Sequence, residues 1–402
     1  MIIMLNNSKH HRYIIAILAL LTCLAFSSCS SEESGPDIHT SSVIRSSATS
    51  MFEYGNFVYF SQGEIYRYNT VTGELTSACL DPECEGKCPL HGGMTRIGMI
   101  DNGKMYFYSF EAFTHNIHFG YQDLISGVVT ILDTLSEYEL SRDITFVNNG
   151  YFYYYAGILK DGGDAKKYDD YATHLCRIPV SGGEREVLET PRGIPQMIVD
   201  GKLVMIGSNI SVYDLDKNLE KVVWNYSEHG FNKVSELSYI NGKIFALAEK
   251  RSENCEKVIN EYTGVEYSKN TFLVSIDIST GEWIMITEDA VESFAVTDDR
   301  VYYYPFELRY LYVPENYEKN PDGVKISFFS STLYSSKHDG SNLKSEYTND
   351  SISACYDYTV IDGKLYGNIS VYDETDRSST RAAFCTVDLA TGDIIHSHDI
   401  RN

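Results

Sequence analysis

A turn-and-strand signature that recurs along most of this 402-residue chain restricts the folds it can adopt. In each copy, a turn rich in Gly, Asn and Asp precedes a run of alternating apolar and aromatic residues. Asn-Gly and Asp-Gly between apolar runs are strong hairpin signals, because both central residues of a type I′ turn need positive φ. Seven copies carry the turn dipeptides Gly55-Asn56, Asn102-Gly103, Asn149-Gly150, Asp200-Gly201, Asn241-Gly242, Asp299-Arg300 and Asp362-Gly363.

A second signature falls between successive copies of the first: a strand, a tight Thr-Gly or Asp-Gly turn, and another strand. Its clearest examples span residues 65–74, 272–282 and 384–393, and the copy near 123–128 is the weakest. Two hairpins make four strands, A to D, and seven repeats over residues 44–400 average about 50 residues, a length typical of propeller blades. A lone four-stranded sheet cannot bury both faces, whereas radially packed blades do.

The sequence therefore predicts an all-β, seven-bladed β-propeller of four-stranded blades, with six or eight blades as the alternative counts. The first repeat begins with its own strand A near Met51 and the last ends near Ile400, so an exchanged strand is not expected to close the ring. Residues 42–46 are predicted to add a strand to the last blade. We expect most of the 32 tyrosines to pack between blades; sugar stacking on a loop face is the alternative.

The first 28 residues predict a signal peptide. A basic stretch at 9–12 precedes the apolar run 13–26, which is too short to span a bilayer comfortably. The small residues before Cys29 resemble the lipobox of bacterial lipoproteins, although Phe26 replaces the usual Leu. The resemblance implies a cut before Cys29 and fatty acylation, such as palmitate, of its thiol. Residues 29–43 would then form a flexible tether and 44–402 the propeller. An ordinary secretory signal cut nearby is the alternative.

This interpretation predicts a lipid anchor in the cell membrane or the outer membrane, with the propeller facing outside the cytoplasm. Lys and Arg number 33 against 56 Asp and Glu, a formal charge of −23. An average field of this sign repels phosphates, so a nucleic-acid partner is not expected.

One face of the predicted propeller carries the longer connections. The A–B and C–D turns are tight, whereas the B–C loops contain insertions, and long loops on a rigid scaffold usually hold binding sites. The predicted insertions are 109–122, 157–173, 249–271, 305–331 and 373–381. The candidate binding residues there, suited to a cation, a glycan or a protein partner, are Asp161, Asp164, Asp169, Asp170, Tyr310, Tyr312 and Tyr317. Insertions without any ligand are the alternative.

The crossover after the first blade holds the most specific side-chain cluster, formed by Cys79, Cys84, Cys88 and His91. Two interpretations remain open from the residues. A disulfide between two of the cysteines is the default in an oxidising compartment, and three thiolates with one imidazole can instead form a closed zinc site. No other cofactor is expected. Of the remaining cysteines, Cys176 and Cys385 occupy equivalent strand C positions, which favours burial, and Cys355 is expected just before the last strand A.

The segment 333–343, with Leu-Tyr followed by Asp-Gly-Ser, resembles a strand of the low-density-lipoprotein-receptor-related propellers. Together with the Asp-Gly-Lys-Leu-Tyr hairpins and the lipobox, the chain resembles uncharacterised bacterial lipoproteins with receptor-like or TolB-like propellers. Their Cys-rich loop is similar to residues 79–84, except that a His usually follows their second Cys, whereas His91 follows the third here. The resemblance implies ligand or partner binding, with no established chemistry to transfer.

Enzyme motifs are absent from the sequence. There is no Gly-x-Ser-x-Gly elbow, no phosphate-binding Gly-rich loop and no repeated sialidase box. We therefore predict a binding or scaffold module with an unknown ligand. The alternative is a polysaccharide-active hydrolase or lyase, which would use loop-face carboxylates with His115 and His118.

Overall fold

The computed structural model describes residues 43–45, 51–81, 83–86, 88–91, 94–111, 114–136, 139, 145–164, 167, 170–188, 193–318, 323–372 and 380–399. The predicted signal peptide, the lipidation site Cys29 and most of the tether lie outside these residues. Within the described ranges, no helix has both the length and the apolar character that crossing a bilayer requires.

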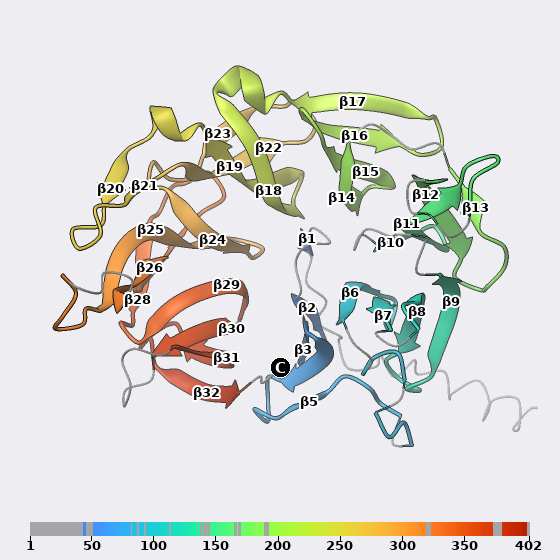
Figure 1. Ribbon diagram of the computed structural model, residues 1–402, viewed down its shortest axis with the longest axis horizontal. Coiled ribbons are helices and arrows are strands. Elements are labelled where there is room, and N and C mark those ends of the chain that lie inside the picture. The colour runs from blue at the N-terminus through green and yellow to red at the C-terminus, as the bar shows by residue number, and fades with distance from the viewer. Residues whose placement is uncertain are drawn as a thin grey trace, which may run out of the picture. The chain divides into compact units, whose positions relative to one another are not determined.

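Seven antiparallel sheets form the blades of a β-propeller, as the repeats predict (Figure 1). Each has four strands in sequence order from the inner strand A to the outer strand D. Blade 1 contains β2 (Met51–Tyr54), β3 (Phe57–Gln62), β4 (Glu64–Asn69) and β5 (Leu75–Ser77). Blade 2 contains β6 (Met94–Asp101), β7 (Lys104–Phe110), β8 (Ile117–Asp123) and β9 (Val129–Leu135). Blade 3 contains β10 (Thr145–Asn148), β11 (Tyr151–Leu159), β12 (Tyr171–Pro179) and β13 (Glu186–Val187).

The remaining blades follow the same order with additions. Blade 4 contains β14 (Ile194–Val199), β15 (Lys202–Ile206), β16 (Ile210–Asp214) and β17 (Leu219–Trp224). Blade 5 contains β18 (Phe231–Ile240), β19 (Lys243–Lys250), β22 (Thr271–Asp277) and β23 (Trp283–Met285). Blade 6 contains β24 (Val291–Val296), β25 (Val301–Tyr312), β27 (Thr332–Ser336) and β28 (Lys344–Thr348). Blade 7 contains β29 (Ile352–Ile361), β30 (Lys364–Tyr372), β31 (Thr380–Asp388) and β32 (Ile394–Asp399).

In the ranges that the structure describes, four short strands and two 3₁₀ helices lie outside this plan or add to it. They are β1 (Ile44–Arg45), β20 (Lys257–Ile259), β21 (Glu266–Ser268), β26 (Lys325–Phe329), η2 (Tyr226–His229) and η3 (Ser252–Asn254). β20 and β21 pair only with each other, whereas β26 pairs with the long strand β25.

The A–B turns have the geometry that their sequences predict. Both central residues have positive φ at five of them, and Asn or Asp fills the first position each time; these turns are Asn102-Gly103, Asn149-Gly150, Asp200-Gly201, Asn241-Gly242 and Asp362-Gly363. Asn and Asp tolerate the left-handed region better than other non-Gly residues, and Gly enters it without a steric cost. The dipeptide therefore fixes both the hairpin and its register.

The C–D turns have a second requirement, which concerns the neighbouring blade. In blade 5 the Asp277 side chain accepts backbone N–H groups of Ser279 and Thr280, and Gly281 closes the turn at φ +78°. A Cβ on Gly281 would lie 2.4 Å from the Val223 carbonyl oxygen of blade 4. The same approach to the preceding blade recurs at Gly127, Gly340, Gly392 and Gly73. Glycine is thus needed at these turns for backbone conformation and for blade packing.

Side-chain packing between blades 7 and 1 closes the ring, since each of these blades supplies its own four strands. The rings of Phe60 and Phe384 stack with centroids 4.3 Å apart, and both side chains are fully buried. Thr386 donates a hydrogen bond to the Tyr68 hydroxyl at 2.9 Å, and His398 Nε2 lies 3.0 Å from the Gly73 carbonyl oxygen. Closure therefore uses the same kind of contact as the other blade boundaries.

The prediction that residues 42–46 extend the last blade is wrong. β1 instead pairs antiparallel with β18 of blade 5, with Ile44 opposite Tyr239, and it lies near the middle of the ring (Figure 1). The inner edge of β18 offers unpaired backbone groups, and a two-residue strand satisfies part of this edge. Sequence could not select this partner, because all seven inner strands present similar edges.

Two further boundaries differ from prediction. Strands continue into the predicted B–C insertions, so the connection in blade 2 is only 111–116 and His118 lies on β8. Cys355 lies within β29 and is fully buried, rather than preceding the strand. Cys176 and Cys385 are buried at equivalent positions of β12 and β31, as predicted. Buried tyrosines such as Tyr154 and Tyr304 pack in the clusters between blades, which confirms the packing interpretation of most aromatic residues.

Two glycines of blade 5 allow the free energy that depends on the contact between blades to be separated from the cost of a left-handed backbone. Gly281 and Gly242 have φ of +78° and +80°, but no atom lies within 4 Å of a Cβ placed on Gly242. Gly242→Ala should cost about 1–2 kcal/mol of unfolding free energy for the left-handed backbone alone. Gly281→Ala should cost about 1–3 kcal/mol more, because the added methyl group overpacks the blade boundary. Equal losses in urea unfolding would contradict this explanation.

Candidate functional site

The propeller has one face of tight turns and one face of longer connections. We call the latter the loop face; it holds the B–C loops and the crossovers from strand D to the next strand A. Blade 4 connects B to C with only Gly207–Asn209, whereas blade 5 uses residues 251–270. Long connections concentrate on this face, as predicted.

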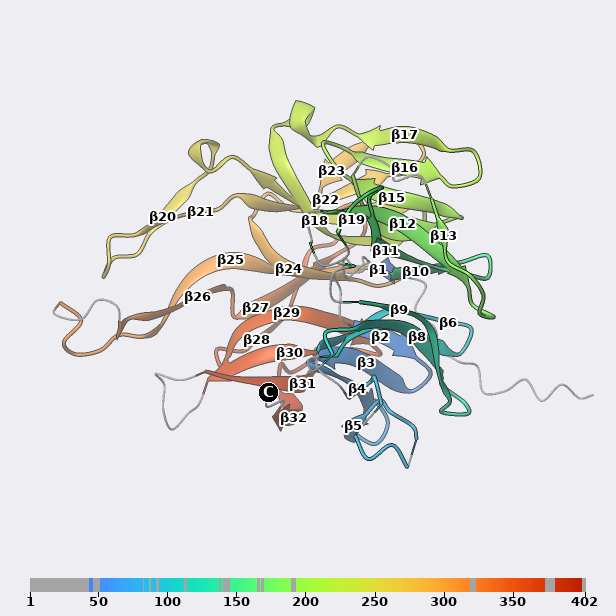
Figure 2. The same ribbon diagram turned by 45° about the vertical axis from the view of Figure 1, so that its right-hand side comes forward.

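Two extensions of blades 5 and 6 project from the loop face (Figure 2). One is the hairpin β20–β21, and the other is the outer part of β25 paired with β26. Tyr262 lies between Tyr310 and Tyr317, with ring centroids 4.8 and 5.0 Å away in edge-to-face geometry. The Tyr310 hydroxyl accepts the Glu261 backbone N–H at 2.8 Å. These contacts join the two extensions, and we call them together the aromatic arm, comprising residues 257–268, 306–318 and 323–329.

The predicted binding tyrosines are therefore brought together, with different surroundings. Tyr310 and Tyr317 are engaged in packing within the arm, and Tyr312 is 37% exposed. Ile259 and Val265 add exposed apolar surface to the same arm. Aromatic and apolar side chains held on a rigid support are common at protein interfaces. Sequence analysis missed Tyr262 and Ile259, because their importance depends on contact between two blades.

The predicted acidic residues lie in the B–C connection of blade 3, away from the aromatic arm. The Asp170 carboxylate accepts the Asp164 backbone N–H at 2.8 Å, and the Asp164 carboxylate lies 3.8 Å from the Lys167 ammonium. Asp161 is exposed in the same turn, and Asp169 lies outside the described residues. Asp164 and Asp170 thus contribute to the shape of their own loop, and the binding role of these residues stays a prediction.

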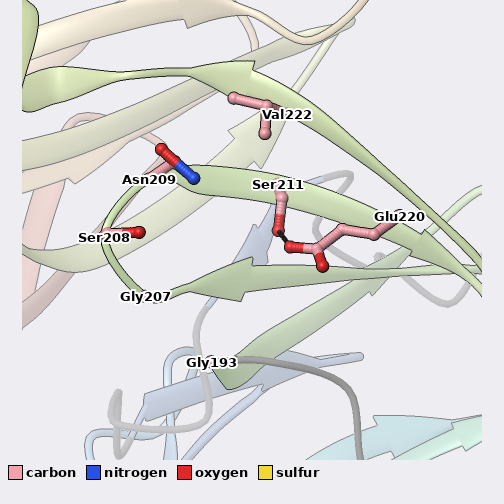
Figure 3. A pocket seen from close by; sticks show the side chains of 7 residues that line it. All are labelled: Gly193, Gly207, Ser208, Asn209, Ser211, Glu220 and Val222. Carbon is pink, nitrogen blue, oxygen red and sulfur yellow. Dashed lines mark hydrogen bonds between the residues drawn. The ribbon is translucent and has the colours of Figure 1, made fainter.

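A cavity of about 300 Å³ opens on the loop face beside blade 4 (Figure 3). It is lined by Gly193, Gly207, Ser208, Asn209, Ser211, Glu220 and Val222. The Ser211 hydroxyl donates to Glu220 Oε1 at 2.6 Å. The lining contains one carboxylate and no histidine, so this cavity lacks the carboxylate pair of a glycoside hydrolase. Its small polar groups suit a small polar molecule.

Three carboxylates lie on adjacent inner strands, next to the centre of the ring. Glu236 belongs to β18, Glu292 to β24 and Asp357 to β29, each beside a register shift. Burial, followed by the charges of Asp357 and Glu292, raises the pKa of Glu236 to about 7. Burial raises the pKa of Glu292 to about 7 as well. Part of the Glu236 side chain is exposed to solvent. The protein that surrounds the rest of it nevertheless removes much of the hydration of its carboxylate, and this loss is the largest cause of the raised pKa. Sequence analysis missed this group, whose only sign was isolated acids in apolar strands.

The two histidines considered for catalysis differ in position. His118 on β8 places Nδ1 3.0 Å from the Thr134 hydroxyl and Nε2 3.4 Å from the Glu111 carboxylate. His115 adopts φ +59° in the connection before it and stacks on Phe110. Both imidazole rings therefore contact other side chains of blade 2, and these contacts explain their positions.

The predicted Cys–His cluster is formed in full. The ligand atoms of Cys79, Cys84, Cys88 and His91 all lie within 4.8 Å of one another, and each residue is half-buried. The Sγ atoms of Cys79 and Cys88 are 3.5 Å apart, and none of the three cysteines is joined in a disulfide. Burial is the largest influence raising the pKa of Cys79 and of Cys88, so neither is a ready thiolate nucleophile at neutral pH.

No family model matches the sequence, and no curated protein matches it. Among solved structures, the chain is similar to a prolyl endopeptidase at 12% identity and a TM-score of 0.53, covering 90% of this chain. It spans about half of that protein, 51%. At this identity the likeness shows the propeller fold alone.

Two other solved structures are less similar. TolB from Acinetobacter baumannii has 12% identity and a TM-score of 0.41, covering 74% of this chain and 60% of its own. Oligogalacturonate lyase from Vibrio parahaemolyticus has 10% identity and a TM-score of 0.47, covering 84% of this chain and 97% of its own. Neither likeness bears on the function of the present chain.

The inner-strand carboxylates Glu236 and Glu292 should make the stability of the fold depend on pH. An unfolded Glu releases its proton near pH 4.5, whereas Glu236 and Glu292 hold theirs to about pH 7 in the folded protein. The folded state is therefore favoured below this window, and the advantage is lost as the pH rises from about 4.5 to 7. The double variant Glu236→Gln, Glu292→Gln should gain thermal stability over the wild type at pH 8 and lose this gain at pH 5.

The surface variant Glu253→Gln is the control, because it also removes a negative charge but lies in η3, away from the ring centre. A gain that is the same at both pH values, or that Glu253→Gln reproduces, would assign the effect to net charge instead.

Proposed function

We propose that this protein is a binding or scaffold module, held at a membrane by an N-terminal lipid, which uses its loop face to engage a protein or glycan partner. The observation that supports this most strongly is the aromatic arm. It combines exposed apolar side chains with a rigid core of packed tyrosines, and it extends from blades whose positions the ring fixes. Preorganised surfaces bind with a smaller entropy cost than flexible loops.

The membrane attachment rests on the lipobox-like sequence ending at Cys29. Two or three acyl chains anchor a protein stably, because each buried methylene contributes about 0.8 kcal/mol. The chain is acidic, with a formal charge of −23, so anionic headgroups would repel it and the lipid would supply the attachment. The location proposed is the cell membrane or the outer membrane, with the propeller facing outside the cytoplasm.

The polarity of β1 supports an orientation for the module. Ile44 pairs with Tyr239, two residues before the tight turn Asn241-Gly242, and the following Arg45 pairs with Ser238. The chain thus runs along β18 in the direction from the turn face towards the loop face. A tether that approaches from the turn face would direct the loop face away from the membrane, where a partner can reach it.

Lipidation can be tested on the intact protein. Cells that process lipoproteins should yield a mature chain whose N-terminal residue is acylated Cys29, and Cys29→Ser should leave the protein unacylated. Labelling with a palmitate analogue, followed by mass spectrometry of the N-terminal peptide, measures both. A mature N-terminus at another residue, without acylation, would support the ordinary secretory signal.

Binding through the aromatic arm predicts a specific pattern of losses. The wild type should be screened on a glycan array and by crosslinking in the cell envelope. Ile259→Ser and Tyr312→Ala, both at exposed positions of the arm, should weaken the partner signal at least about tenfold, as interface anchors do. Ile125→Ser should not, because this 86% exposed side chain lies in a C–D turn on the turn face. Equal effects of all three would remove the arm from the proposal.

A second candidate function is a polysaccharide-active enzyme, and one observation favours it. Glu236 and Glu292 interact with each other, and both have a pKa raised to about 7, as general acids often do. Product analysis with acidic polysaccharides tests this candidate. Turnover that Glu292→Gln abolishes would establish the enzyme, and binding without turnover would leave the binding module.

A further inference from the structure

We propose that Cys79, Cys84, Cys88 and His91 bind one Zn²⁺ ion as a closed structural site. Their four ligand atoms lie within 4.8 Å of one another. Tetrahedral zinc with bonds of about 2.3 Å to sulfur and 2.0–2.1 Å to nitrogen places its ligands about 3.5–3.8 Å apart. The 3.5 Å between the sulfurs of Cys79 and Cys88 agrees with this spacing and exceeds a disulfide bond of about 2.05 Å.

The backbone around the cluster directs N–H groups at the sulfurs. The Cys88 N–H donates to Cys84 Sγ at 3.3 Å. The backbone amides of Asp81 and Leu90 hydrogen-bond to the sulfurs of Cys79 and Cys88. Three thiolates carry one more negative charge than Zn²⁺ neutralises, and such N–H groups stabilise the excess. Glu85 and Gly86 have φ of +48° and +73°, so the chain reverses sharply between the second and third cysteines.

The histidine has the outer partner that a metal ligand normally has. His91 Nδ1 lies 3.5 Å from the Glu64 carboxylate, at the start of β4 in blade 1. A carboxylate that accepts one ring N–H fixes the tautomer and leaves the other ring nitrogen free to bind metal. Nε2 of His91 is therefore the proposed ligand atom. Glu64 comes from another segment, so sequence spacing could not associate it with the cluster.

A metal explains all four side chains, whereas a disulfide explains two. If any two of the cysteines formed a disulfide, the third thiol and the imidazole would still lie beside it, and a disulfide gives no reason for their presence. Thiolate and imidazole are the ligands that Zn²⁺ prefers, and four protein ligands leave no position for substrate. The role is therefore structural.

The ion would fix the crossover between blades 1 and 2 on the loop face. Leu90, between the last two ligands, is 1% exposed and packs into the core between these blades. The neighbouring Pro89 carbonyl oxygen accepts hydrogen bonds from Thr95 at 3.0 Å and Ser109 at 2.6 Å, on β6 and β7. The zinc ligands on either side and the buried Leu90 between them would together hold a segment that has no regular secondary structure.

The test uses the full chain, expressed without a metal-binding tag and purified anaerobically. Elemental analysis should find one zinc per chain in the wild type, and mass spectrometry should find the cluster thiols reduced. Zinc content should fall at least about tenfold in Cys84→Ser and Cys88→Ser. Cys255→Ser is the matched control, because it removes a half-buried thiol from a loop of blade 5 outside the cluster, and it should keep its zinc.

Two further measurements guard against misfolded variants. Co²⁺ exchanged into the wild-type protein should give the visible bands of tetrahedral cobalt and thiolate charge-transfer bands in the near ultraviolet. Glu64→Gln, which preserves every ligand, should lower zinc affinity about 10- to 100-fold in competition with a chromogenic chelator.

Three results would overturn the proposal: a zinc-free wild type with two cluster cysteines joined in a disulfide, zinc retained in both cluster variants, or octahedral cobalt spectra. None of these bears on the aromatic arm, so the zinc site and the proposed binding function can fail separately.

Discussion

The close approach of neighbouring blades at the C–D turns is the constraint on which the rest of this structure depends. At Gly281 the backbone comes so near to the Val223 carbonyl oxygen of the preceding blade that a Cβ has no room. Gly73 of blade 1 repeats this approach against His396 of blade 7. The ring thus closes by the contact that joins its other blades, without an exchanged strand. This boundary also brings Phe60 onto Phe384 and buries both rings.

In a ring fixed in this way, the residues needed for the fold lie on one face and the longer connections lie on the other. Tight turns with Asn-Gly or Asp-Gly occupy one face, where the backbone leaves little room for insertion. The loop face carries the longer connections, and two of them build the aromatic arm through contacts between Tyr262, Tyr310 and Tyr317. The arm gains rigidity from these contacts and still exposes Ile259 and Tyr312. A surface of this kind suits recognition of a partner better than chemistry on a small substrate.

The chemically distinctive groups lie apart from the arm. The cluster of Cys79, Cys84, Cys88 and His91 belongs to the crossover between blades 1 and 2, and the acids Glu236 and Glu292 belong to inner strands of blades 5 and 6. The cluster offers only protein ligands to a metal, so its contribution is to the shape of the loop face. The acids are the groups whose ionisation the fold opposes, because burial raises the pKa of each to about 7.

The sequence by itself determined the blade count, the four-stranded repeat, the A–B and C–D turns and the cysteine cluster. Each depends on local chemistry: positive φ at Asn-Gly, the alternation of a half-buried strand, or ligands close together along the chain. Only the tertiary structure decided that β1 joins blade 5 instead of blade 7, that Glu64 faces His91, and that Glu236 meets Glu292 and Asp357. These pairings join residues far apart in sequence. The inner strands have similar edges and the acids are isolated in the sequence, so neither specifies its partner locally, and only the closed ring brings the partners together.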